Sequence, residues 1–472
     1  MKVFFAVFIC RILYFIGKRL GRGSSLPGKV VLKVFPGVLR QLRLPEIVIA
    51  VTGSNGKTTT TELIADALSD SGMSVGWNHE GSNQTEGIAT LLLRISSFGG
   101  KVKRDAIVME CDERYARFIF ENVRPSVLLV TNLCRDQLTR NGHPEFIGDC
   151  IRAAIGVLGA GVGAGSGAGG TAGVGMRLVL NADDPYVAAL AETRGEWTPG
   201  CASTTEGVRD GADVLWFGVS AESGTTERVR MYDDGAFCPV CKARMIYSYR
   251  IAGHYGAYSC AACGLQRVQP EVEAVMRWED SVLSFGDGLG LKVSHPSLTN
   301  AYNYCAAVAV AKAVGIDVDD SVRALDGYEI IGGRVTALSV DGRGGLLLLS
   351  KHENSFAYDC SLSWIVTQKK PCTVIILVDA ISRKYYTSET SWFWDIDFDL
   401  LADENVKNVV LAGRYVNELA TRFALSAVDE SKIVYVPVLD DLKRYVKENT
   451  VGDIYALTCF SDKWKLLKAF GV

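Results

Sequence analysis

The chain has 472 residues, which is too long for one hydrophobic core, so two or three domains are expected. Its 50 basic and 53 acidic residues give a net charge of -3, and this balance does not favour nucleic acid as a partner. Thirteen cysteines without a credible secretion signal indicate a reducing compartment. We therefore expect a cytoplasmic protein whose thiols bind metal or lie buried.

The first 16 residues are apolar but do not form a secretion signal. Arg11 interrupts the apolar run, and basic residues follow from Lys18 where a cleavage site requires small residues. The run is too short to cross a bilayer, and its apolar positions recur at helical spacing. We expect a helix that docks on the first domain. Contact of residues 1–20 with the inner face of the membrane is the alternative.

A glycine-bounded loop that ends in Gly-Lys-Thr directly follows the apolar run 47–51, and the helical pattern 59–68 comes next. In this context glycines let backbone N–H groups turn toward a polyphosphate, the lysine reaches the outer phosphates, and the threonine hydroxyl binds magnesium. An unoccupied glycine turn has no need of the Lys-Thr ending. The sequence therefore predicts that ATP or GTP binds to Gly53, Ser54, Asn55, Gly56, Lys57, Thr58 and Thr59.

The apolar runs 47–51, 106–109, 127–130 and 178–180 alternate with longer mixed segments, as in a mostly parallel sheet covered by helices. A run of small residues, 156–175, predicts a flexible surface loop without a chemical role. Short strands and turns are expected over 214–285, and a helix over 303–314. Further buried strands at 346–349, 373–378 and 409–411 predict a second α/β unit.

Polar residues follow several of these strands and should meet at the carboxyl edge of the sheet, where open α/β folds bind ligands. The first group is the acidic stretch 110–113, in which Glu110 is the expected magnesium ligand and a helix cap is the alternative. Thr131-Asn132-Leu133 leads into Asp136-Gln137 after the next strand. Residues 181–184 follow the fourth strand, where a capping turn alone would explain them.

Two CxxC pairs, separated by eighteen residues, have the spacing of a tetrahedral four-cysteine zinc site. Four thiolates leave no open position on the metal, so the site should be structural and contribute folding free energy on the order of 10 kcal/mol. A redox dithiol and an iron-sulfur site are the alternatives. The expected zinc ligands are Cys238, Cys241, Cys260 and Cys263.

Six segments in one order resemble the Mur ligase family. The cysteine ribbon inside the central region, and Asp136-Gln137 where ordinary Mur ligases have Asp-His, make the chain similar to the MurT-type branch of that family. The resemblance implies an α/β fold with an N-terminal helical segment (1–45), a central ATP-binding domain (46–333) with the zinc ribbon at 232–268, and a smaller C-terminal α/β domain (334–472). The six segments are 52–59, 110–113, 131–137, 181–185, 300–303 and 333–334.

The resemblance also implies a function: ATP-dependent amidation of the D-glutamate α-carboxyl of lipid II, to give D-isoglutamine. In this pattern Lys57 and magnesium, held by Thr58 and Glu110, neutralise the transferring phosphoryl group. Asn303 would contact adenine and Arg334 the phosphates. Lys351 corresponds to the second-domain lysine that meets the phosphoryl group, and a solvated lysine after a strand is the alternative.

Nothing in the chain resembles a glutaminase, so ammonia must come from elsewhere. The resemblance implies a separate GatD-type glutamine amidotransferase subunit whose Cys and His are completed by an aspartate of the MurT-type chain. Glu389 stands where that aspartate is expected, one methylene longer. It is the candidate third member of the triad, although placement of such a group is demanding.

Departures from the family pattern keep other hypotheses open. Thr336 replaces an expected glutamate, and residues 351–357 differ from the usual stretch, so a diverged ligase that amidates another muropeptide carboxylate is an alternative. A zinc-ribbon ATPase that binds nucleic acid is a second alternative, disfavoured by the charge balance. A non-catalytic scaffold for a glutaminase is a third, and the intact phosphate loop argues against it.

Overall fold

The computed structural model of the chain divides into two compact units. The first unit contains Met1–Leu133, Pro144–Glu227 and Asp234–Ile330, and the second contains Cys134–His143, Arg228–Asp233 and Ile331–Val472. The second unit therefore includes two short segments that come from within the sequence of the first. The structure describes residues 1–19, 24–79, 81–137, 141–159, 176–192, 213–226, 231–286, 288–330, 335–380 and 390–471.

The first unit is built on a nine-stranded sheet of the described residues, with the order β11-β10-β9-β6-β5-β4-β1-β3-β2. The strands from β2 to β9 in this order are parallel, and β10 and β11 extend the sheet as antiparallel strands. The bounds are β1 (Ile47–Thr52), β2 (Val75–Trp77), β3 (Ala106–Glu110), β4 (Val127–Val130), β5 (Arg177–Asn181), β6 (Val214–Val219), β9 (Val272–Arg277), β10 (Val282–Phe285) and β11 (Leu289–Lys292).

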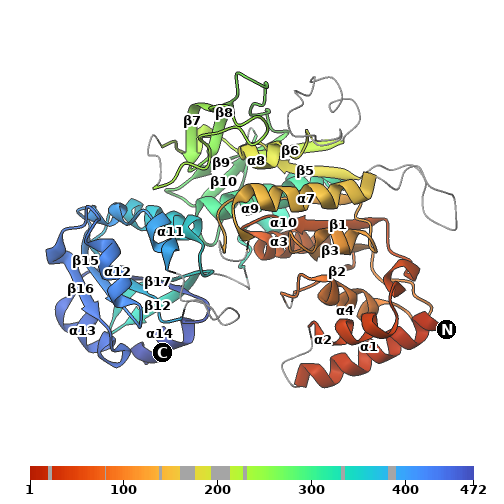
Figure 1. Cartoon of the computed structure of the whole chain (residues 1–472), viewed down its shortest axis with the longest axis horizontal. Coiled ribbons are helices and arrows are strands. Elements are labelled where there is room, and N and C mark those ends of the chain that lie inside the picture. The colour runs from red at the N-terminus through yellow and green to blue at the C-terminus, as the bar shows by residue number, and fades with distance from the viewer. Residues whose placement is uncertain are drawn as a thin grey trace. The chain divides into compact units, whose positions relative to one another are not determined.

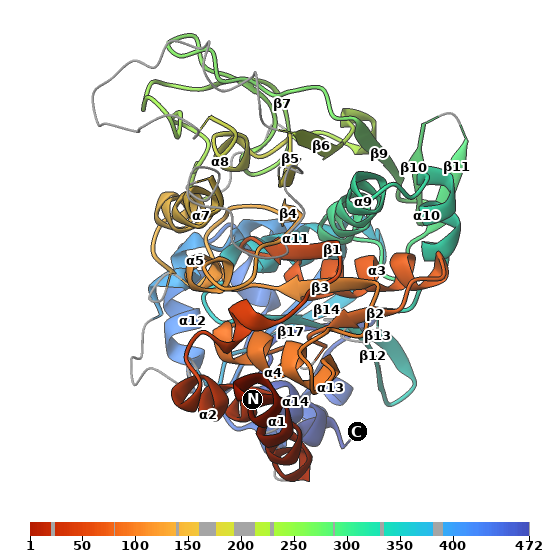
Figure 2. The same cartoon turned by 90° about the vertical axis from the view of Figure 1, so that its right-hand side faces the viewer.

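Helices cover both faces of this sheet, which is why its central strands are apolar throughout rather than alternating. In Figure 2, α3 (Lys57–Asp70), α9 (Leu298–Ala313) and α10 (Val318–Leu325) lie on one side of the strands. The other face packs against α4, α5, α7 and α8, and α1, α2 and the 3-10 helix η1 pack outside α4. Their bounds are α1 (Lys2–Arg19), α2 (Leu26–Val34), η1 (Val38–Gln41), α4 (Thr85–Ile95), α5 (Ala116–Phe120), α7 (Pro144–Gly159) and α8 (Pro185–Ala188).

A small hairpin module carries the two cysteine pairs. Its antiparallel strands β7 (Ile246–Ala252) and β8 (Tyr255–Ser259) form a separate two-stranded sheet beside η3 (Ala221–Ser223), at the top of Figure 1. A satellite cluster of buried side chains, which includes Cys238, Tyr258 and Cys260, forms its core. The module therefore has its own small core in addition to that of the main sheet.

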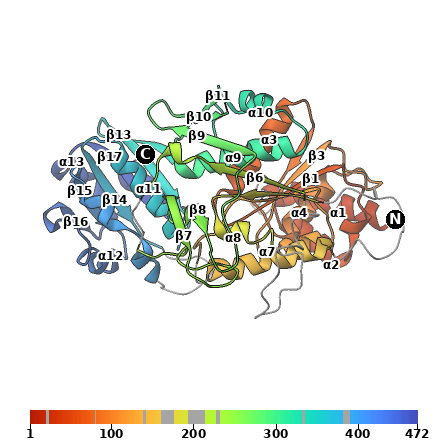
Figure 3. The same ribbon diagram turned by 90° about the horizontal axis from the view of Figure 1, so that it is seen from above.

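The second unit is a six-stranded sheet with the order β12-β13-β17-β14-β15-β16, in which only β12 is antiparallel to its neighbour. Two buried clusters, one on each face, hold the helices against it; Figure 3 shows α12 and α13 on opposite sides of the strands. The elements are β12 (Val335–Val340), β13 (Arg343–Ser350), α11 (Ser355–Thr367), β14 (Cys372–Leu377), η4 (Ser391–Asp395), η5 (Phe398–Ala402), β15 (Val406–Ala412), α12 (Val416–Phe423), η6 (Glu430–Lys432), β16 (Ile433–Val436), η7 (Leu439–Asp441), α13 (Leu442–Asn449), β17 (Asp453–Cys459) and α14 (Lys463–Phe470).

The predicted α/β class and the predicted strands are confirmed, because each apolar run forms a strand of a parallel-rich sheet. One boundary was wrong: the flexible loop was expected from residue 156, but α7 continues to Gly159, where helical spacing of Ile151, Ile155 and Leu158 still buries side chains. Residues 160–175 lie outside the described part. Among the described residues, none of the helices combines the length and the apolar character needed to cross a bilayer.

Candidate active site

The phosphate loop forms at the carboxyl end of β1, and its two glycines are required by the geometry. Gly53 has φ +123° and Gly56 has φ +82°, both in the region that side chains disfavour. A Cβ at Gly53 would also clash with Thr131, and a Cβ at Gly56 with Asn303. The loop turns directly into the first turn of α3, whose N–H groups have no partners within the helix and form an anion-binding site.

Residues at the end of β4 hold the loop from the side. The Ser54 N–H donates to the Asn132 carbonyl (2.8 Å), and the Asn55 N–H donates to Asn132 Oδ1 (2.9 Å). The Asn55 carbonyl in turn accepts from Thr131 Oγ1 (2.8 Å) and from Asn132 Nδ2 (3.0 Å). The expectation that Thr131 and Asn132 reach the same sheet edge as the loop is therefore confirmed, and they fix its shape.

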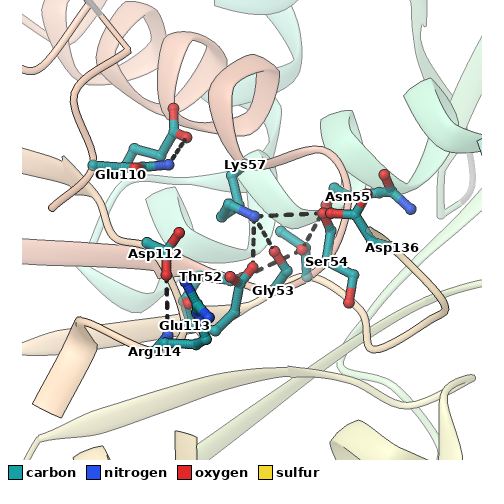
Figure 4. A network of polar contacts seen from close by, with 12 residues as sticks. Thr52, Gly53, Ser54, Asn55, Lys57, Glu110, Asp112, Glu113, Arg114 and Asp136 are labelled. Carbon is teal, nitrogen blue, oxygen red and sulfur yellow. Dashed lines mark hydrogen bonds and ion pairs between the residues drawn. The ribbon is translucent and has the colours of Figure 1, made fainter. Parts of the chain in front are cut away.

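Lys57 lies inside the loop rather than in solvent. Its Nζ donates to the carbonyls of Gly53 and Ser54 and pairs with Glu113 Oε1 at 2.5 Å (Figure 4). The Lys57 side chain is only 8% exposed and that of Glu113 only 4%, so this ion pair is largely removed from water. Thr58, the next residue of α3, is exposed.

Glu110 ends β3 beside the loop, and Figure 4 draws its carboxylate apart from the Lys57 network. Asn83 Nδ2 donates to Glu110 Oε1 (3.0 Å), while the Glu110 backbone exchanges two hydrogen bonds with the Asn78 amide. Glu110 and Glu113 are thus two buried carboxylates on one turn, one held by amides and one by Lys57, and either fits the oxygen chemistry of magnesium.

The predicted adenine contact, Asn303, lies on α9 against the phosphate loop. Its Oδ1 accepts from Thr60 Oγ1 at 3.2 Å and faces Gly56, and its Nδ2 donates to Asn300. The neighbouring Tyr302 donates to Asp183 Oδ2 (2.9 Å). This places Asn303 where it supports the first turn of α3.

The stretch 181–184 mainly joins parts of the first unit. Asp184 caps α8 by accepting from two of its N–H groups and also accepts from the Leu133 N–H (2.7 Å). Asp183 accepts from Arg267 Nε (2.7 Å), the Val219 N–H (2.7 Å) and Tyr302. The capping turn that was the alternative for this stretch is therefore present. Asp183 also links the hairpin module that carries the cysteine pairs to α9.

The four predicted zinc ligands converge. Their sulfur atoms all lie within 4.8 Å of one another, with Cys238 Sγ 3.6 Å from Cys263 Sγ and Cys241 Sγ 3.4 Å from Cys260 Sγ. These separations exceed a disulfide bond of about 2 Å and approach the sulfur spacing of about 3.8 Å that zinc–sulfur bonds of about 2.3 Å give in a tetrahedron.

The two knuckles of the site have the same backbone geometry. In each, the N–H four residues after the first cysteine donates back to that cysteine's carbonyl. The cysteine's own N–H donates to the carbonyl five residues further on, that of Ala243 or Leu265. Lys242 and Gly264 occupy the same left-handed position, with φ +64° and +79°. Burial raises the pKa of Cys238, and it raises that of Cys263 to about 11. At Cys260 hydrogen bonds from backbone N–H groups and neighbouring thiols outweigh burial and lower the pKa to about 7, which favours a thiolate there. The residues fit a structural zinc ion.

In the second unit, Lys351 follows β13 and pairs with Asp136 Oδ2 at 2.9 Å. Asn354, which caps α11, donates from Nδ2 to Asp136 Oδ1 (2.9 Å), so both oxygens of this buried carboxylate are occupied. The Gln137 N–H donates to the Glu353 carbonyl (2.9 Å). The two motifs lie far apart in the sequence, and the structure brings them together.

Two predicted site residues, Arg334 and Glu389, lie outside the described residues. Three functional contacts were not anticipated: Glu113 as the partner of Lys57, Asn83 as the support of Glu110, and Asp136 as the partner of Lys351. The run of acids at 110–113 was a signal for the first. The other two depend on tertiary pairing and have no local signal.

The chain is similar to known proteins over most of its length. The Mur ligase middle domain model matches residues 51–265, and the MurT ligase C-terminal model matches residues 351–462. A Streptococcus pneumoniae protein named lipid II isoglutaminyl synthase (glutamine-hydrolyzing) subunit MurT is 27% identical over 95% of this chain and 92% of its own. Its Staphylococcus aureus (strain N315) namesake is 25% identical over 92% of this chain and 90% of its own.

Solved structures agree on the fold. A pseudomurein peptide ligase type C from Methanothermus fervidus has a TM-score of 0.64 at 19% identity and covers 91% of this chain and 79% of its own. MurF from Acinetobacter baumannii has a TM-score of 0.61 at 16% identity, with 94% and 80% covered. At such identities the likeness concerns the fold alone.

The matches to Mur ligase models and to MurT relatives, in a chain that forms a phosphate loop on a parallel sheet, identify it as an ATP-dependent ligase of the Mur type. The two family models together cover more than half of the residues, and relatives named MurT align over nearly the whole length. The chain belongs to the Mur ligase family, and its C-terminal region is of the MurT type.

Proposed function

We propose that this chain uses ATP to activate the α-carboxyl group of D-glutamate in lipid II, and that ammonia then converts this group to the amide of D-isoglutamine. In this reaction the γ-phosphoryl group passes to a carboxylate oxygen, ADP leaves, ammonia attacks the carbonyl carbon of the acyl phosphate, and phosphate is released. The observation that carries the proposal is the alignment of 92–95% of the chain with relatives named MurT, in a fold that forms the phosphate loop.

The residues of the first unit would perform the nucleotide-binding part of this task. The N–H groups of the loop and of the first turn of α3 would bind the phosphates, and Lys57 would exchange its partner Glu113 for phosphate oxygens. Magnesium, when bound, neutralises charge on the transferring group, and Thr58 and Glu110 would hold it. Asn303 would hold the first turn of α3 in place and would also contact the adenine of the nucleotide.

The second unit would supply the remaining cations. Lys351 would meet the phosphoryl group once released from Asp136, and Arg334 would bind phosphate. Asp136, whose other oxygen accepts from Asn354, holds the Lys351 ammonium in a defined position, which limits the entropy lost when it binds an anion. The zinc ion would be structural, because four cysteines leave it no open position.

Ammonia would be delivered by a separate subunit, a GatD-type glutaminase, with Glu389 as the carboxylate that completes its catalytic triad. Glutamate at this position keeps the charge but moves it by one methylene. A Glu389→Gln variant should lose glutamine-driven activity and keep ammonium-driven activity. Equal loss of both would show that Glu389 has another role.

The decisive experiment measures phosphate release by the purified chain with ATP, ammonium and either lipid II or a soluble muropeptide. Turnover should require both the acceptor and ammonium, and Lys57→Ala should abolish it. Consumption of ATP without the acceptor, or no consumption under any condition, would rule out the proposed amidation.

A second candidate is amidation of another muropeptide carboxylate, and the unusual stretch 351–357 favours it, because it carries Lys351 and the Asp136 partner Asn354. Mass spectrometry of the product, with fragmentation of the peptide, distinguishes the two. An amide on a residue other than D-glutamate would establish the second candidate.

We propose a cytoplasmic location for either reaction, since ATP is the shared substrate.

A further inference from the structure

Helix α1 packs on the first unit with its small side chains and presents its large apolar side chains to solvent. The buried face consists of Ala6, Val7, Cys10 and Gly17, which allow close approach to α2 and α4. Cys10 Sγ, for example, lies 3.9 Å from the Thr90 carbonyl of α4. Val3 and Ile9 are partly buried against the same core. A helix whose only task was docking would also bury its phenylalanines, and α1 leaves them exposed.

The exposed face of α1 is continuous and unusually apolar. At 100° per residue its most exposed large apolar side chains fall within an arc of about 120°. Their exposed fractions range from 43% to 59%, apart from Met1 at 99%, and Phe98 beside Phe4 is 42% exposed. We call this surface the α1 face. It consists of Met1, Phe4, Phe5, Phe8, Ile12, Phe15 and Ile16.

The charge around the α1 face has one sign. Residues 1–45 contain nine of the chain's 50 basic residues and none of its 53 acidic residues, although the whole chain has a net charge of -3. Lys2, Lys18 and Arg19 flank the apolar arc on α1, and Lys29 and Lys33 are exposed on the adjacent α2. The Arg19 guanidinium stacks on Phe15, 4.3 Å from the ring centroid, at the boundary between the apolar and basic parts.

We propose that the α1 face binds the surface of an anionic phospholipid bilayer, with the phenylalanines inserted at the level of the headgroups and the basic residues on the lipid phosphates. Aromatic and aliphatic side chains on one side of a helix, flanked by lysine and arginine, are what such a surface binds. The helix lies at an edge of the first unit, outside α4 (Figure 1).

A second copy of the chain or a protein partner could also cover apolar residues. Neither explains why residues 1–45 contain no aspartate or glutamate. A self-complementary interface would bring the basic residues of two copies together and leave them without counter-charges. An anionic bilayer neutralises all of them at once. If the acceptor is lipid II, as proposed above, docking also concentrates the enzyme where its acceptor lies, but the inference does not depend on that acceptor.

The test is co-sedimentation of the full chain with vesicles that lack lipid II, made either of phosphatidylcholine alone or of equal parts phosphatidylcholine and phosphatidylglycerol. Binding should be strong to the anionic vesicles, weak to the neutral ones, and weakened by salt. The double variant Phe8→Gln/Phe15→Gln should lower vesicle affinity about tenfold or more. Phe118→Gln, which removes an equally exposed phenylalanine from α5, should leave it unchanged.

A charge variant separates the basic residues from the apolar face. Lys18→Glu/Arg19→Glu should lower the affinity for anionic vesicles about tenfold or more and abolish its salt dependence, whereas Lys447→Glu on α13 should have little effect.

All variants should keep the melting temperature of the parent chain, because the side chains are exposed. Equal binding of parent and variants, or binding only to neutral vesicles, would overturn the proposal. So would a variant that leaves vesicle binding intact but converts a dimer to a monomer. Failure of amidation alone would not affect it.

Discussion

Lys57 and Lys351 are two lysines for which the same phosphoryl group is proposed, and their surroundings differ. Lys57 is held by carbonyls of its own loop and by Glu113, and its side chain is only 8% exposed. Lys351 is held by Asp136, from a segment more than two hundred residues earlier, and its side chain is 26% exposed. Both lysines pair with a carboxylate that is distant in the sequence, and Lys57 is held in addition by the backbone of its own loop.

This difference suggests a division of work. A lysine fixed by its loop is in position before any ligand arrives, which suits ground-state binding of a nucleotide as well as the transition state. A more exposed lysine of the second unit, which pairs with a carboxylate after its strand, suits a contact made only as the reaction proceeds. Each of the following variants tests one part of this comparison.

The largest effect is expected for Lys57→Ala, which should lower turnover about a thousandfold and weaken nucleotide binding, because both ground state and transition state lose a cation. The buried Glu113 would be left unpaired and destabilise the fold, so Lys57→Ala/Glu113→Gln should restore the melting temperature but not activity. Phosphate release and nucleotide titration measure the two effects. Lys101→Ala, at an exposed position, is the control.

Cys260→Ser should remove zinc and lower the free energy of unfolding by about 3 kcal/mol or more. Turnover should fall as well, because Arg267 of the cysteine module holds Asp183, which in turn holds Tyr302 beside Asn303. Metal analysis and thermal unfolding provide the measurements. Cys150→Ser, outside the cluster, should retain one zinc per chain; a Cys260→Ser protein with full zinc and stability would contradict the assignment.

Lys351→Ala is expected to lower kcat about a hundredfold and leave nucleotide affinity close to that of the parent chain, in contrast to Lys57→Ala. Asp136→Asn removes the charge that holds Lys351 but keeps a similar shape. It should therefore lower kcat less than Lys351→Ala does. An unchanged kcat in Lys351→Ala would mean that this lysine is only a solvated partner of Asp136.

Gly56→Ala should weaken nucleotide binding about tenfold and destabilise the fold, because alanine at φ +82° is strained and its Cβ would clash with Asn303 Oδ1. Gly72→Ala is a matched control, with φ +88° and open space around it. It should cost only the backbone strain, about 1–2 kcal/mol. Equal effects of the two variants on nucleotide binding would show that the contact with Asn303 is not important.

The smallest effect concerns the two zinc knuckles, which differ at their left-handed position. Lys242→Gly should stabilise the chain by about 0.5–1 kcal/mol, since glycine adopts φ +64° without strain, as Gly264 does in the other knuckle. Lys242 also pairs with Glu145 at the surface, so the comparison is best made in a Glu145→Gln background. Chemical denaturation measures the difference in the free energy of unfolding. A loss of stability in that background would show that the backbone at Lys242 is not strained.

The sequence by itself determined the motifs whose chemistry lies within a few residues. The phosphate loop, the two cysteine pairs and the buried strands could be predicted, because glycine freedom, ligand spacing and apolar runs act over one turn or one strand. The order of the motifs also indicated the Mur ligase family, and the comparisons confirm it.

Only the tertiary structure decided which side chains meet across the fold. The pairing of Lys57 with Glu113 and of Lys351 with Asp136 depends on where distant strands end. The same holds for the orientation of α1, because helical spacing places apolar residues around most of the helix. Packing against α2 and α4 selects the small ones for burial and leaves the phenylalanines in solvent.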